Sequence, residues 1–230
     1  VNCLLHRIEH SQRMPVRWGD SLLSNLQLWP QADVILNVLA FASEPTDDLG
    51  KHDTSLALLQ HIYQTLKPGG RAAVVLPDKV LTAAGPAQQV RRTLLDTCVV
   101  HTVLRLPNGI FYPHHLPAHL LFFRKGQTAE EQTQTVWFYD ARTGFPSFGP
   151  HRPLTREYLL PFETIYGDDP LGKAPRQEEG ENGRWRCVSR VSLATLGDRL
   201  DFCWLQPKEA ATEDNVTEEV QELLDNTVEE

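Results

Sequence analysis

The sequence predicts an α/β fold, a doubly wound sheet that closes with an antiparallel hairpin at its edge. Two observations predict it. A helix, a glycine turn and an apolar strand follow one another over residues 53–76, and a second helix and strand follow over residues 87–106, which is the order of crossover units in parallel sheets. The next strand, expected at 118–123, comes after a loop too short for a crossover helix, so it should pair antiparallel with its predecessor.

The chain is expected to begin with the end of a helix over residues 1–10 and a short strand at 15–18. It opens on a valine and its one methionine is Met14, so we expect the N-terminal part of the fold to precede residue 1. Asp20 stands just past the short strand. A carboxylate at that position either orients a ligand or caps the next turn.

The stretch Ala32–Phe41 is expected to organise the chain. Val34–Leu36 predicts a buried strand that leads into a loop with one amide, Asn37, and one aromatic ring, Phe41. Chemistry in open α/β sheets takes place just past the carboxyl ends of strands. This loop is therefore either a substrate-binding tip or an ordinary strand end with a capping asparagine and a core phenylalanine.

The first crossover unit has clear helix and strand signals. Asp53 can cap a helix over residues 53–66, in which apolar side chains recur at spacings of three and four. Lys67–Gly70 should end this helix, because glycine suits the left-handed position after it. The apolar run Arg71–Leu76 predicts a strand covered on both faces, as in a parallel sheet.

The second unit leads to an aromatic loop. Its helix, over residues 87–97, should direct Arg91 and Arg92 to solvent. Phe111 and Tyr112 lie on the loop after its strand, where aromatic rings either stack on a nucleobase or fill the core. Three histidines between residues 114 and 119 have no acid or cysteine at ligand spacing, so no metal site is expected.

Three parts are expected along the chain. Residues 1–140 form the sheet domain, with a further strand at 136–139, and residues 141–207 form a loop-rich extension and linker with one helix at 155–166. Residues 208–230 predict an acidic amphipathic helix with a capping-box start. This helix either docks on a partner or folds back on its own body.

Composition narrows the class of protein. The net charge is −8, but nine acidic and no basic side chains fall within residues 209–230, which leaves the rest at about +1 and able to face a polyanion. Four distant cysteines predict free thiols in a cytoplasmic protein. No run approaches the ~18 apolar residues of a membrane span. The sequence contains no nucleophile elbow, Walker loop or dinucleotide-binding fingerprint. It therefore gives no support for a classical hydrolase, a nucleotidase or a dinucleotide-binding enzyme.

A colinear series of motifs covers nearly the whole chain. It comprises Leu4–Ile8, Gly19–Leu22, Asp33–Leu36, Leu59–Ile62, Lys67–Pro77, Val90–Leu95, Leu104–Tyr112, Val136–Trp137, Tyr139–Asp140, Pro146–Gly149, Pro161–Glu163, Tyr166–Gly167, Leu200–Asp201 and Trp204–Leu205. In this order the motifs resemble the modification (M) subunits of type I restriction–modification enzymes.

The resemblance implies a Rossmann-like methyltransferase fold that uses S-adenosylmethionine and methylates adenine N6 in double-stranded DNA. It also implies a complex with a specificity (S) subunit and a restriction (R) subunit. By the same resemblance Asn37 and Phe41 would hold the target base, and Asp20 would lie near the adenine of the donor. Phe111 and Tyr112 would line the pocket of the target base.

The sequence departs from that family in two places. If residues 1–140 are the C-terminal portion of a methyltransferase domain, the Gly-rich loop and the acidic residue that bind the donor's methionine part are absent from the chain. The family has Asn-Pro-Pro-Phe where this sequence has Asn37-Val38-Leu39-Ala40-Phe41, which is one residue longer and lacks both prolines. The alternative is therefore a catalytically inactive member that serves as a structural, partner-binding component.

Overall fold

Six strands form one sheet in the order β1-β2-β4-β3-β5-β6. The computed structural model describes residues 31–38, 54–111, 116–180 and 182–205. The elements, in chain order, are β1 (Ala32–Val38), α2 (Thr54–Thr65), β2 (Leu66–Pro77), α3 (Asp78–Thr82), α4 (Pro86–Thr97), β3 (Cys98–Arg105), β4 (Ala118–Lys125), β5 (Thr135–Asp140), the 3-10 helix η2 (Arg156–Leu159), α5 (Leu160–Tyr166), β6 (Trp185–Ser189) and α6 (Arg190–Thr195).

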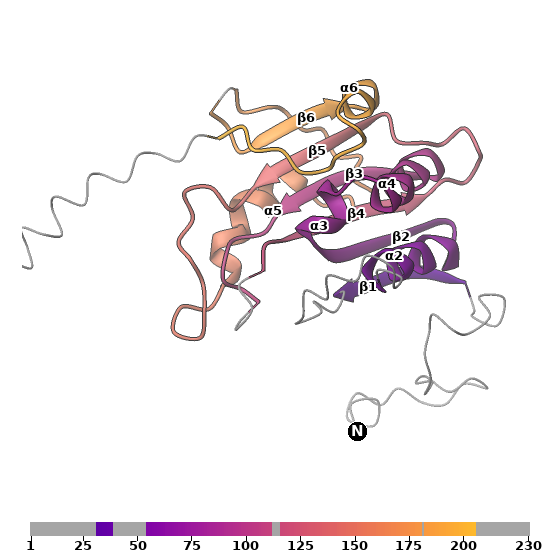
Figure 1. Ribbon diagram of the computed structural model, residues 1–230. Coiled ribbons are helices and arrows are strands. Elements are labelled where there is room, and N and C mark those ends of the chain that lie inside the picture. The colour runs from indigo at the N-terminus through magenta and orange to yellow at the C-terminus, as the bar shows by residue number, and fades with distance from the viewer. Residues whose placement is uncertain (1–30, 39–53, 112–115, 181, 206–230) are drawn as a thin grey trace, which may run out of the picture.

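The helices cover the two faces of the sheet unequally (Figure 1). On one face α2, α4 and α6 contribute to a large core with the inward side chains of β2, such as Val74 and Leu76. On the other face a smaller core gathers around α5, where Phe162 packs with Tyr139 and Trp185. None of the helices in the described part of the chain is both long and apolar enough to cross a membrane.

The predicted fold class is confirmed, including the antiparallel pairing of β3 with β4. In one detail the sheet differs from the expectation, because β4 lies between β2 and β3 rather than at the edge. Leu121 and Phe123 of β4 enter the large core, while Leu120 and Phe122 pack against the smaller one. A strand that is apolar on both faces is suited to the interior of a sheet.

The predicted burial is wrong for β1 and confirmed in part for β2. β1 is a strand as expected, but it pairs only with β2 among the described residues, and Leu36 is 77 % exposed. In β2 the side chains alternate between buried and half-buried, so Ala72, Val74 and Leu76 are covered while Ala73 is not fully so. The covering helix α5 lies over the other half of the sheet, against Tyr139 and Trp185.

The expected helix at 87–97 is confirmed by α4, but one of its side chains points the other way. Arg91 is 1 % exposed rather than in solvent. Its Nε donates to the carbonyl of Asp198 at 2.8 Å and its Nη1 to the carbonyl of Val80 at 2.8 Å. The apolar spacing did not reveal these carbonyl partners, one of which lies 107 residues away along the chain. Arg92 is exposed as predicted.

The extension beyond residue 140 contains elements that the sequence pattern did not reveal. β6 pairs antiparallel with β5 and forms an outer strand of the sheet, and α6 joins the large core through Leu193. The predicted helix at 155–166 is confirmed as η2 followed by α5. The helix end at 1–10, the short strand at 15–18 and the helix at 208–230 lie outside the described residues.

Candidate functional site

Charged side chains stand at the carboxyl ends of the parallel strands, which meet at one edge of the sheet. Asp78 directly follows β2, Arg105 is the last residue of β3, and Asp140 is the last residue of β5. His119 reaches the same edge from the start of the antiparallel strand β4. Ligands of open α/β sheets bind at this carboxyl edge, so the candidate site is built here.

His119 is fully buried between two carboxylates. Its Nδ1 lies 3.0 Å from Oδ1 of Asp78, and its Nε2 lies 3.0 Å from Oδ1 of Asp201, which arrives from the segment after α6. An ionised carboxylate can only accept hydrogen bonds. Each ring nitrogen of His119 therefore lies beside a hydrogen-bond acceptor.

Two arginines extend this arrangement in both directions. Arg105 donates from Nη1 to Asp140 at 2.8 Å, and its Nε lies 2.7 Å from Asp201. Arg142 approaches Asp78 at 3.2 Å. The result is a series in which acidic and basic side chains alternate, which we call the edge network: Asp140, Arg105, Asp201, His119, Asp78 and Arg142.

The edge network keeps its carboxyl groups ionised. Burial opposes the ionisation of Asp78, but the contacts with His119 and Arg142 outweigh it and lower the pKa to about 2. Burial likewise opposes the ionisation of Asp201, yet His119 and Arg105 lower its pKa. For Asp140, backbone N–H donors and Arg105 overcome burial and lower the pKa. These buried charges are therefore paired, as buried charges must be to remain ionised.

Asp78, His119 and Asp201 each offer one atom that could hold a metal, and these atoms lie within 4.8 Å of one another. The surroundings fit an ion-pair network better than a cation site. Each carboxylate already contacts a guanidinium, Arg142 for Asp78 and Arg105 for Asp201.

Asn37 stands one residue before the end of β1 and thus also at the carboxyl edge. It pairs in register with Val74, which is fully buried, so the amide lies on the face covered by α2 and α4. Its Oδ1 is buried and has no hydrogen-bond partner among the described residues. A buried acceptor without a donor carries a desolvation penalty of about 1–3 kcal/mol, so the amide is poised to receive an N–H group.

The structure places the other predicted site residues as follows. Phe111 is partly buried on the loop after β3 and packs against the smaller core. β2 and β4 separate the strand of Asn37 from the strand before Phe111, a distance of about 14 Å at ~4.8 Å per strand. Asp20, Phe41 and Tyr112 lie outside the described residues.

Sequence reasoning missed the edge network. Asp78 and Asp140 were not considered as site residues, although each stands where an apolar strand ends, which is the signal that also selected Asn37. Arg105 carries the same signal at the end of β3. Asp201 had no such signal, because it reaches the edge from a segment outside the strands.

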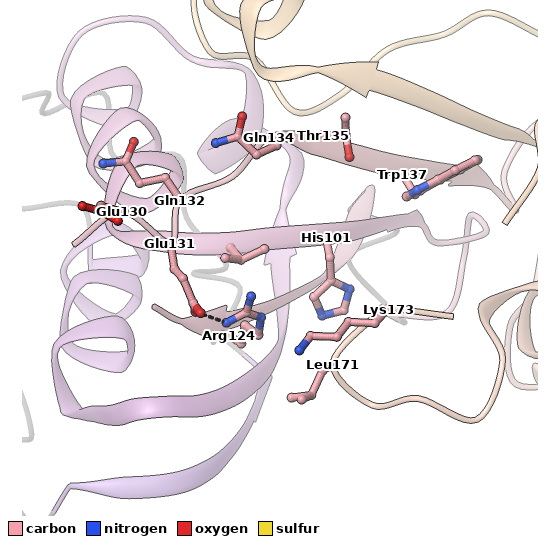
Figure 2. Close-up of a pocket in the computed structure, with 12 residues that line it drawn as sticks. His101, Arg124, Glu130, Glu131, Gln132, Gln134, Thr135, Trp137, Leu171 and Lys173 are labelled. Atoms are coloured by element: carbon pink, nitrogen blue, oxygen red, sulfur yellow. Dashed lines mark hydrogen bonds and ion pairs between the residues drawn. The ribbon is translucent and has the colours of Figure 1, made fainter. Parts of the chain in front are cut away.

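A cavity of about 350 Å³ lies at the opposite edge of the sheet (Figure 2). His101 near the start of β3, Arg124 near the end of β4 and Thr135 at the start of β5 contribute to its lining. Arg124 is paired with Glu131 there. Burial lowers the pKa of His101 to about 3, with Arg176 and Arg124 adding to the effect, so this imidazole is neutral. None of the predicted site residues lines this cavity.

Three comparisons with known proteins agree with one another. A family model described as N-6 DNA Methylase matches residues 1–189. The methylase subunit of the type I restriction enzyme StySPI from Salmonella potsdam is 40 % identical over 95 % of this chain, and that of EcoKI from Escherichia coli K12 is 39 % identical over 95 %. The crystal structure of the EcoKI M protein matches 99 % of this chain with a TM-score of 0.80 and 37 % sequence identity.

The chain spans about half the length of the curated relatives it matches. The alignments cover 48 % of the StySPI and EcoKI methylase subunits. The structural match covers 55 % of the EcoKI M protein chain. The described sheet thus corresponds to one part of a longer polypeptide in each of these relatives.

Proposed function

The chain belongs to the N-6 DNA methylase family, as one of the methylase subunits of type I restriction enzymes, and from this we propose that its polypeptide transfers a methyl group to adenine N6 in double-stranded DNA. The methyl donor is S-adenosylmethionine. The chain itself supplies the part of the active site that receives the target base. It works in the cytoplasm, in complex with a specificity (S) subunit that reads the DNA sequence and a restriction (R) subunit.

The observation that carries the proposal is the buried Oδ1 of Asn37, which stands at the carboxyl end of β1 and has no hydrogen-bond partner among the described residues. The exocyclic amine of adenine is a poor nucleophile, because its lone pair is delocalised into the ring. An acceptor that binds one of its hydrogens draws electron density toward the nitrogen and holds the amine in place. Asn37 is suited to this role, and the base would reach it after flipping out of the duplex.

In this proposal the other predicted site residues lie around the amide of Asn37. Phe41 stacks on the flipped base and offsets part of the unstacking cost of a few kcal/mol. Phe111 and Tyr112 line the far side of the base pocket, and Asp20 lies near the adenine of the donor. Phe111 is partly buried on the loop that leaves β3 at the carboxyl edge, and it packs against the smaller core.

The described residues do not by themselves form a complete donor site. Gly69–Gly70, the paired glycines of the described residues, lie within β2 and do not join the end of a strand to a helix. We therefore assign most donor contacts to the part of the methylase polypeptide that this chain does not cover in its relatives.

The degenerate loop after Asn37 favours a second candidate. Without the prolines that keep the family's acceptors aimed, the chain would act as a catalytically inactive scaffold that retains the fold and the partner surface. The two candidates make opposite predictions for Asn37. An active enzyme depends on its side chain, whereas a scaffold does not.

The test is methyl transfer by the methylase polypeptide with its S subunit, measured with radiolabelled S-adenosylmethionine and duplex DNA. Asn37→Ala should lower kcat by about a hundred- to a thousand-fold, the usual effect of removing one preorganised polar group. Val38→Ala is the matched control, because Val38 is the next residue of β1 and is 62 % exposed on the opposite face. Its kcat should stay within about twofold of the wild type.

Incorporation by the wild type that equals that of Asn37→Ala would contradict the methyltransferase proposal and support the scaffold. Equal losses in Asn37→Ala and Val38→Ala would contradict the specific role of the amide. The assembly of both variants with the S subunit, measured by gel filtration, distinguishes a catalytic loss from a folding loss.

A further inference from the structure

The side chain of Arg142 joins both ends of the loop between β3 and β4. Its Nε donates to the carbonyl of Leu106, where the loop leaves β3, at 3.1 Å. Its Nη2 donates to the carbonyl of Ala118, where the chain enters β4, at 3.0 Å. The same Nη2 also donates to Asp78 at 3.2 Å. One guanidinium therefore ties three separate segments of the carboxyl edge together.

The backbone of Arg142 is itself held in place. Asp140, fully buried, accepts hydrogen bonds through Oδ1 from the backbone N–H of Arg142 at 2.7 Å and of Thr143 at 2.9 Å. The Arg142 side chain is only 13 % exposed. The turn after β5 thus presents the guanidinium to the loop in a fixed orientation, so little conformational entropy is lost when its bonds form.

The segment after Arg142 also packs directly on the start of the loop. The N–H of Phe148 donates to the carbonyl of Asn108 at 2.9 Å. Gly109 has a φ of +83°, and a Cβ added there would lie 1.9 Å from the carbonyl oxygen of Phe148. Residues 108 and 109 therefore have no freedom to shift toward the 141–149 segment. The next two residues, Ile110 and Phe111, pack on the smaller core.

We infer that Arg142 is a positioning residue that sets the conformation of the segment Leu106–Phe111 and thereby the place of the Phe111 ring at the carboxyl edge. This inference rests on the proposed function for its effect on catalysis, but not for its effect on the loop. Arg142 acts through the two carbonyls and Asp78, and it does not touch the base. Lysine cannot replace it, because one ammonium group cannot reproduce the fork that reaches both carbonyls and the carboxylate.

The experiment uses the methylase polypeptide in complex with its S subunit and compares Arg142→Ala and Arg142→Lys with the wild type. Arg142→Lys keeps a positive charge and a long side chain, so it tests the inference even if the alanine variant does not fold. The matched control is Arg190→Ala, which removes a similarly buried arginine with ion pairs to Asp96 and Asp198, away from the loop. Hydrogen exchange of the backbone amides of residues 108–111 reports the loop directly.

Both Arg142 variants should speed exchange at residues 108–111 by at least about tenfold, while Arg190→Ala leaves it unchanged. In the methylation assay kcat should fall by about ten- to a hundred-fold with an unchanged KM for DNA, as expected when a group is misplaced by about 1 Å. Unchanged exchange at residues 108–111 in the Arg142 variants would overturn the inference. A wild-type complex that transfers no methyl group would instead overturn the proposed function, and the exchange measurement would still decide the role of Arg142.

Discussion

His119 links the two halves of the edge network. It contacts Asp78, which follows β2, and Asp201, which belongs to the segment after α6, each at 3.0 Å. Loss of either carboxylate leaves a buried ring nitrogen of His119 without its partner. A buried polar group that loses its partner keeps its desolvation penalty, so this loss should destabilise the fold.

The pKa of Asp78 makes the stability of the fold depend on pH. Its folded pKa of about 2 lies below the ordinary value of 3.8, so the stabilisation is present above pH ~4 and is lost as the pH falls toward 2. The shift corresponds to about 2 kcal/mol in the free energy of unfolding. In urea titrations the difference between the wild type and Asp78→Asn should shrink by about this amount between pH 6 and pH 2.

The control for Asp78 is Asp96→Asn, which removes an exposed carboxylate that also pairs with an arginine. Its difference from the wild type should stay within about 0.5 kcal/mol over the same pH range, because exposed ion pairs contribute little. A pH-independent difference for Asp78→Asn would show that its carboxylate is not held ionised by the network.

At the scale of elements, β1 and β2 differ in what covers them. β1 exposes Val34, Leu36 and Val38, which pair in register with the half-buried residues of β2. The opposite face of β2 enters the large core through Val74 and Leu76. Apolar side chains of β1 and β2 therefore differ in burial: those of β1 on one face of the sheet are exposed, and those of β2 on the other face are buried.

Leucine-to-alanine substitutions in these two strands should have unequal effects on the 230-residue chain. Leu76→Ala removes a fully buried side chain and should lower the free energy of unfolding by about 2–5 kcal/mol. Leu36→Ala removes one that is 77 % exposed and should change it by less than about 0.5 kcal/mol. Chemical denaturation measures both. Equal losses would show that Leu36 is covered in solution.

At the scale of the whole molecule, the segment after α6 joins the helices α3, α4 and α6 to the carboxyl edge of the sheet. Asp198 pairs with Arg92 of α4 and with Arg190 of α6, and Leu200 donates from its N–H to the carbonyl of Leu81 in α3. Asp201 then completes the edge network. The last described residues therefore connect the helical face of the sheet with its carboxyl edge.

The acidic segment 208–230, predicted to dock on a partner, follows directly after this connection. Leu224→Ser, on its predicted apolar face, should weaken co-purification of the S subunit by at least about tenfold, the effect of losing one buried anchor side chain. Glu222→Ser in the same segment should not. Wild-type co-purification of the Leu224 variant would favour a helix without a role in docking. The thermal unfolding of both variants should match the wild type.

The sequence by itself determined the fold class, most of the elements and the edge on which the candidate site lies. Those features follow from local patterns: apolar periodicity, glycine turns and the short loop that forces β3 and β4 to pair antiparallel. The motif order likewise identified the family. The same local logic selected Asn37, because it stands at the end of an apolar strand.

The tertiary structure alone decided which faces are covered and which charges meet. Burial of Arg91 depends on Asp198, and the edge network depends on Asp201, both of which are more than 80 residues distant from their partners in α4 and β4. The central place of β4 and the pairing of β6 with β5 are equally non-local. A pattern within one segment records which side chains are apolar, but contacts between distant segments arise only when the whole chain has packed.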